Sequence, residues 1–94
     1  MNNAVKYNKG HKTDFYIDIT NEVCPLTFVK TKLLIESMLP GQIAEVRLKG
    51  QEPLENVPRS VIDHGHSVIS LERESPTEPA DGVHRLILKK SETP

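Results

Sequence analysis

Cys24 is the residue of this chain best suited to chemistry, because it is the single cysteine and stands directly before Pro25, where a helix is expected to begin. At the amino end of a helix several backbone N–H groups are unpaired and the helix dipole is positive. Such a position favours a thiolate and lowers the cysteine pKa from its ordinary value of about 8.5. We therefore expect Cys24 to be solvent-accessible, to titrate below a free cysteine and to act as a nucleophile.

Other interpretations of Cys24 stay open at this point. A free cysteine is often buried and only fills space, although the polar Asn21 and Glu22 before it speak against an apolar setting. A histidine could serve as its base, as in cysteine hydrolases, but the sequence places none of the four beside it. A single cysteine excludes an internal disulfide, a C-x-x-C pair and a cysteine-rich zinc site.

The only closely spaced histidines are His64 and His66, on either side of Gly65. They lack the paired ligands of structural zinc sites, so we expect no metal and no other cofactor. His64 more simply suits the carboxyl end of a helix, and Gly65 suits the left-handed residue that stops one.

The composition limits the possible partners. The chain has 94 residues, 12 basic and 13 acidic, and a formal net charge of −1, which gives no basic surface for direct nucleic-acid binding. No apolar run approaches the roughly 20 residues that span a bilayer, and residues 1–12 are too polar for a signal peptide. We expect one cytoplasmic domain at residues 14–89 without a membrane partner, flanked by flexible tails at 1–13 and 90–94.

The hydrophobic pattern predicts six elements. Apolar residues alternate in the four expected strands, whereas each expected helix is bounded by proline or glycine. Pro58 makes the second helix short and weak, because a proline either begins that helix or divides a loop from it. The predicted strands are 14–19, 43–48, 68–71 and 83–88, the predicted helices are 25–39 and 53–64, and residues 75–82 form a loop.

The predicted order is therefore βαβαββ. Two β-helix-β steps join strands in parallel with right-handed crossovers, and a hairpin then adds an antiparallel strand. This predicts a two-layer α/β sandwich with a mixed four-stranded sheet and two helices on one face.

The segment from Asp18 to Thr27, followed by a helix and Pro40-Gly41, resembles the TusA/SirA-like sulfur-carrier family. That family has an aspartate six residues before a Cys-Pro-x-Pro motif, and Asp18, Cys24 and Pro25 occupy those positions. The resemblance implies a βαβαββ fold and a cysteine that accepts sulfur from a cysteine desulfurase or another donor protein. The sulfur then passes to an acceptor protein, for tRNA thiolation or other sulfur metabolism.

The chain departs from the family motif at Thr27, which replaces the second proline, and at Asn21, which replaces a glycine. Asparagine tolerates the left-handed backbone, and a threonine hydroxyl can cap the first helical turn. Thr27 leaves open an alternative function, a non-catalytic interaction or regulatory module that keeps the fold. Asp18 is expected to bind loop amides before the helix and so to hold Cys24 indirectly.

The first helix carries two apolar stripes about 140° apart, too far for both to face one sheet. We assign the stripe of Phe28, Thr31, Ile35 and Met38, with Leu39, to the core. Unless the helix lies deep enough in the sheet and tails to bury both, the other stripe should be at least partly exposed beside Cys24 and should dock a partner protein, with Lys30 nearby to attract an anionic one. This expected docking strip consists of Leu26, Val29 and Leu33.

Overall fold

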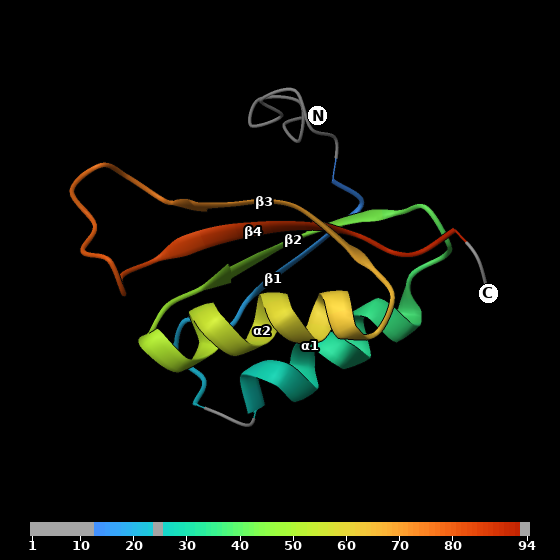
Figure 1. Cartoon of the computed structure of the whole chain (residues 1–94), viewed down its shortest axis with the longest axis horizontal. Helices are drawn as coiled ribbons and strands as arrows, with labels where there is room; N and C mark the ends of the chain where they lie inside the picture. The colour runs from blue at the N-terminus through green and yellow to red at the C-terminus, as the bar shows by residue number, and fades with distance from the viewer. Residues whose placement is uncertain (1–12, 24–25, 93–94) are drawn as a thin grey trace.

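The computed structural model describes residues 13–23 and 26–92, and its elements follow the predicted order βαβαββ. Figure 1 shows two layers, with both helices packed on one face of a four-stranded sheet. The predicted fold class is thus confirmed. The elements are β1 Phe15–Asp18, α1 Leu26–Ser37, β2 Ile43–Leu48, α2 Gln51–Asp63, β3 Ser67–Arg73 and β4 His84–Lys89.

The strand order in the sheet is β1-β2-β4-β3. β1 pairs with β2 in parallel, and β4 is antiparallel to both β2 and β3. Two helical crossovers therefore run β1, β2 and β3 in one direction, and the returning β4 occupies the place between β2 and β3. β3 is longer than the predicted 68–71, because it follows β4 past an irregularity between Val68 and Ser70.

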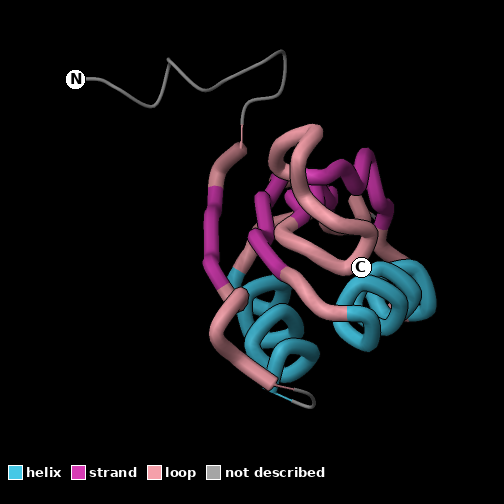
Figure 2. Tube along the Cα trace, turned by 90° about the vertical axis from the view of Figure 1, so that its left-hand side faces the viewer, coloured by secondary structure: helices cyan, strands magenta, loops and turns pink. Residues whose placement is uncertain are grey.

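The core lies between the sheet and the helices, as the side view in Figure 2 shows for the two layers. Ala44, Val46 and Leu48 on β2 are fully buried there, whereas the residues between them point to the open face. All of the fully buried large hydrophobic side chains are aliphatic, which agrees with a composition that has no tryptophan and few other aromatics.

α1 turns most of the predicted stripe toward the sheet, with Thr31 and Ile35 buried along it and Met38 buried just after the helix, whereas Phe28 is only half-buried and lies outside the core cluster. The assignment of Leu39 to the core was wrong, since its side chain is 66% exposed. α1 ends at Ser37, and the Leu39 N–H bonds the Gln42 Oε1 at 2.8 Å instead of continuing the helix. The chain therefore leaves the helical path before Leu39 could turn inward.

α2 is longer than predicted, because it begins at Gln51 and continues through Pro58. A proline inside a helix removes one hydrogen bond and crowds the preceding turn. Here Pro53, Val57 and Val61 are buried against the sheet and offset that cost. The expectation that Pro58 begins the helix or separates a loop from it was wrong, since tertiary packing overrides the local penalty.

The carboxyl end of α2 is the predicted glycine stop. Gly65 has a φ of 90°, which favours glycine, and its N–H bonds the Ile62 carbonyl at 2.9 Å. His64 donates from Nδ1 to the Ser60 carbonyl at 2.8 Å, so it satisfies one of the last helical carbonyls.

The residues just after β4 bind to the rest of the domain. Lys90 exchanges backbone hydrogen bonds with Gln42 and Gly41, and the Ser91 N–H bonds the His66 Nδ1 at 3.0 Å. Although the sequence pattern assigned 90–94 to a tail, these contacts extend the packed chain to Ser91. The hydrogen bond from Ser91 requires a neutral His66, because protonation of Nδ1 would remove the acceptor.

The stability of the protein should fall as the pH is lowered from about 7 to 5. Burial, with Lys90 and His64 nearby, lowers the pKa of His66 from its ordinary 6.5. Below that ordinary value the unfolded chain binds a proton that the folded chain resists, so the stabilisation present at higher pH is lost as the pH falls. Urea unfolding across this range should show the slope, and His66→Gln should flatten it; an unchanged slope in that variant would contradict the assignment.

Candidate functional site

The candidate site lies at the amino end of α1. Cys24 and Pro25, the predicted nucleophile and the predicted first helical residue, lie outside the described residues. The residues on either side are described, and both are exposed: Val23 by 69% and Leu26 by 45%. The described part of the site consists of the loop that precedes Cys24 and the helix that follows it.

The loop from Ile19 to Val23 is anchored at its start. Ile19 is 1% exposed in the core, and its N–H bonds the Arg47 carbonyl at 2.8 Å. The Glu22 N–H then closes a turn onto the Ile19 carbonyl at 3.1 Å. Asn21, within that turn, does not adopt the left-handed backbone for which it could have replaced a glycine. The turn therefore forms here without a positive φ.

Asp18 binds the loop as the sequence predicts. Its Oδ1 accepts the Thr20 N–H at 2.9 Å and the Thr20 hydroxyl at 2.7 Å. The backbone hydrogen bond from Thr20 is the main cause that lowers the pKa of Asp18, and Arg47 lowers it further. Asp18 is therefore an ionised acceptor at neutral pH.

Lys30 is not a free cation of the surface. Its Nζ lies 2.7 Å from the Glu22 Oε2, an ion pair that joins α1 to the loop before Cys24. Glu22 offsets the charge that was expected to attract an anionic partner. In this structure Lys30 joins two segments of the site, in addition to the docking role that the sequence suggested.

Thr27 does not cap the first turn, and that prediction was wrong. Its side chain is 1% exposed, and its hydroxyl has no hydrogen-bond partner among residues 13–23 and 26–92. Thr27 lies one turn before Thr31 on the buried face of α1, and the Thr31 hydroxyl donates to the Thr27 carbonyl at 2.8 Å. The orientation of the helix thus turns the Thr27 side chain into the core instead of toward the free backbone N–H groups.

The expected docking strip is exposed along α1. Leu26, Val29 and Leu33 are 45%, 40% and 59% exposed. Because α1 buries the opposite stripe, the helix presents an apolar surface that begins two residues after Cys24. The exposure of the three side chains agrees with the sequence analysis.

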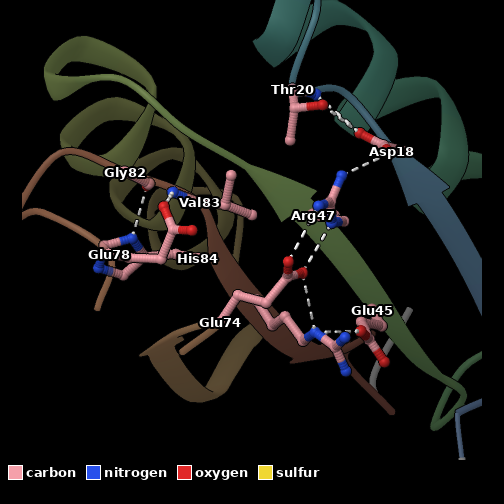
Figure 3. A network of polar contacts seen from close by, with 10 residues as sticks. Asp18, Thr20, Glu45, Arg47, Glu74, Glu78, Gly82, Val83 and His84 are labelled. Atoms are coloured by element: carbon pink, nitrogen blue, oxygen red, sulfur yellow. Dashed lines mark hydrogen bonds and ion pairs between the residues drawn. The ribbon is translucent and has the colours of Figure 1, made fainter. Parts of the chain in front are cut away.

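Sequence reasoning missed Arg47 and Glu74, which Figure 3 shows beside Asp18 on the open face of the sheet. Arg47 donates from Nη1 to the Asp18 Oδ2 at 3.0 Å and forms two further bonds to Glu74. The hydrogen bonds from Arg47 are the main cause that lowers the pKa of Glu74 to about 2, and Arg85 lowers it further. One feature of the sequence could have indicated Arg47, because it lies on the polar side of the predicted strand that runs parallel to the strand of Asp18. No feature of the sequence indicated Glu74.

The histidines lie elsewhere. His64 and His66 line a cavity of about 130 Å³ between α1 and α2, where the His64 ring lies 5.9 Å from the Phe28 ring. Among residues 13–23 and 26–92, no three histidine or carboxylate side chains are grouped to hold a metal ion. Neither helix in those residues is long and apolar enough to cross a membrane.

A family model described as sulfurtransferase TusA matches residues 15–90, which include the loop, the Cys24-Pro25 step and both helices. The chain belongs to the TusA family. The resemblance in the cysteine motif thus extends over the whole folded region. Thr27 is then a variation within that family.

Curated relatives of this TusA family member include proteins named as sulfur carriers. One from Archaeoglobus fulgidus is 46% identical over 57 residues, which cover 61% of this chain and 65% of that protein. One from Thermotoga maritima is 37% identical over 62 residues, covering 66% of this chain and 78% of the relative. The chain thus spans slightly less than two thirds of the first relative's length.

The fold also matches a solved structure. The crystal structure of a SirA-like protein from Desulfitobacterium hafniense superposes with a TM-score of 0.63, covering 82% of this chain and 97% of that one. The sequence identity is 18%, so this likeness supports the fold alone.

Proposed function

We propose that the protein is a sulfur carrier, a persulfide sulfurtransferase that accepts sulfur on Cys24 and relays it to an acceptor protein. The observation that carries the proposal is the family match over residues 15–90, which spans the cysteine motif. The loop geometry supports it, because the chain on both sides of Cys24 is exposed and the preceding turn is held by Asp18.

The transfer is an exchange at sulfur. The Cys24 thiolate attacks the outer sulfur of a donor persulfide, a new S–S bond forms to Cys24, and the donor S–S bond breaks to release the donor thiolate. The proton of the persulfide stays with the transferred sulfur or passes to the donor thiolate. A second thiolate, on the acceptor, then takes the outer sulfur from Cys24 in the same way, with no net oxidation and no cofactor.

The roles of the site residues follow from this chemistry. Cys24 is the nucleophile, and the unpaired N–H groups after Pro25 favour both its thiolate and its perthiolate. Asp18 holds the loop that leads to Cys24 through its hydrogen bond with Thr20. Thr27 supports the first turn of α1 from the core side. A free thiol of this kind persists in a reducing compartment, so we place the transfer in the cytoplasm.

The partners are a cysteine desulfurase or other sulfur-donor protein, and an acceptor that leads to tRNA thiolation or other sulfur metabolism. We assign the docking strip of Leu26, Val29 and Leu33 to the donor, because it adjoins Cys24 and because the near-neutral chain offers little charge steering. An apolar surface beside the thiol would hold the persulfide of the donor within reach.

Intact mass spectrometry tests the proposal. After incubation with a cysteine desulfurase and cysteine, the protein should gain the mass of one sulfur atom, and Cys24→Ala should gain none. Incubation with a thiol reductant should then remove the added sulfur. Absence of an adduct on the wild-type protein would instead support a non-catalytic interaction module.

A further inference from the structure

Asp18 is held from two sides, as Figure 3 shows. One carboxylate oxygen accepts both bonds from Thr20, whereas the other accepts the Arg47 Nη1 at 3.0 Å. The main chain repeats the contact, because Asp18 and Arg47 are paired across β1 and β2 and the next residue, Ile19, bonds the Arg47 carbonyl. Arg47 therefore holds the start of the loop with both its backbone and its side chain.

Arg47 is itself held by Glu74, which directly follows β3, the strand at the opposite edge of the sheet from β1. Its Nε and Nη2 donate to the two carboxylate oxygens of Glu74 at 2.7 Å and 2.9 Å. This two-pronged contact fixes the plane of the guanidinium, which a single bond would leave free to rotate. The third donor, Nη1, is thereby directed at Asp18.

Arg85 shares part of this network but does not reach the loop. It is the strand partner of Arg47 on β4, and its Nε lies 3.3 Å from Glu74 and 3.6 Å from Glu45. In the described part of the chain it forms no bond to Asp18. The two arginines share Glu74 on the open face of the sheet, but within the described residues only Arg47 contacts the motif aspartate.

The two-pronged Arg47–Glu74 contact also stabilises the sheet, because a bidentate ion pair within a network contributes more than an isolated surface pair. Among the described residues, the loop has few other ties between Ile19 and α1: the turn closed by Glu22, the Leu26 N–H bond to the Val23 carbonyl at 2.7 Å, and the Glu22–Lys30 pair. We propose that Arg47, held by Glu74, is a positioning residue that acts through Asp18 to place the loop leading to Cys24. The inference rests on the proposed function for its activity readout, and thiol reactivity provides a second, independent one.

The test compares Arg47→Met with Arg85→Met. Both variants remove one arginine from the same face, and Arg47→Met should lower the melting temperature more, because it also loses the two-pronged contact with Glu74. Arg47→Met should slow sulfur loading by a desulfurase about tenfold to a hundredfold, the scale of a misplaced reactive group, and should shift the pH profile of Cys24 alkylation by iodoacetamide. Arg85→Met should leave both unchanged.

Equal loading and equal alkylation profiles in folded Arg47→Met and wild type would overturn the inference. If Arg47→Met does not fold, Glu74→Gln should also slow sulfur loading and shift the alkylation profile. Wild-type loading and a wild-type profile in Glu74→Gln would overturn the inference equally. If the wild-type protein takes up no sulfur, the proposed function fails, and the alkylation profile alone decides whether Arg47 positions Cys24.

Discussion

Leu26→Ser combined with Val29→Ser should slow sulfur loading by a donor protein about tenfold or more while leaving thermal stability close to that of wild type. The two side chains are 45% and 40% exposed on the docking strip beside Cys24. Most interface residues contribute less than about 1 kcal/mol each, so two replaced side chains together reach about 1.4 kcal/mol, which corresponds to a tenfold change in affinity. The loading rate is measured by intact mass spectrometry of samples quenched at successive times, with a desulfurase as donor.

Leu39→Ser is the matched control for this variant. Leu39 is an exposed apolar side chain of the same segment but lies beyond the opposite end of α1 from Cys24. Its replacement should leave loading unchanged. Loading by a small polysulfide should be normal in every variant, because that donor needs no docking surface. Equal rates with the protein donor in the double variant and wild type would exclude the strip as its binding surface.

Thr27→Val should raise the free energy of unfolding by about 1–2 kcal/mol. The Thr27 hydroxyl is buried without a partner in the part of the chain that the structure describes, and such a group costs about 1–3 kcal/mol relative to its hydration in the unfolded chain. Valine has nearly the same shape and the same branched Cβ, so it removes the polar atom without opening a cavity. Urea unfolding measures the change, which corresponds to a rise of several degrees in melting temperature.

Thr31→Val provides the contrast, since its hydroxyl is also buried but bonds the Thr27 carbonyl at 2.8 Å. That replacement should lower the unfolding free energy by about 0.5–1.5 kcal/mol, the usual net contribution of a hydrogen bond. The two substitutions therefore have opposite expected signs on one helix face. A loss of stability in Thr27→Val would mean that the hydroxyl has a favourable role.

The elements that the sequence predicted well are those decided by local pattern. Alternation in 43–48 placed Ala44, Val46 and Leu48 on the buried side of β2, and Gly65 stops α2 because its backbone conformation is a property of that residue. The Asp18 contact with Thr20 was predictable for the same reason, since the two residues are two positions apart.

The orientation of α1 was only partly predictable. The periodicity identified two stripes, and the choice between them was right for Leu26, Val29 and Leu33. It was wrong for Leu39, because the end of the helix depends on the Gln42 side chain, and for the hydroxyl of Thr27, because its direction depends on how the helix rests on the sheet.

The sequence by itself determined the order of elements, the aliphatic core and a single cysteine two residues before the first residue of α1, because these depend on residue type and short-range spacing. The tertiary structure decided that β4 lies between β2 and β3, and that α2 continues through Pro58. It also decided that Arg47 joins Asp18 to Glu74, contacts that span 29 and 27 positions of the chain. Such contacts form only when distant segments pack against one another, so no local pattern of the sequence specifies them.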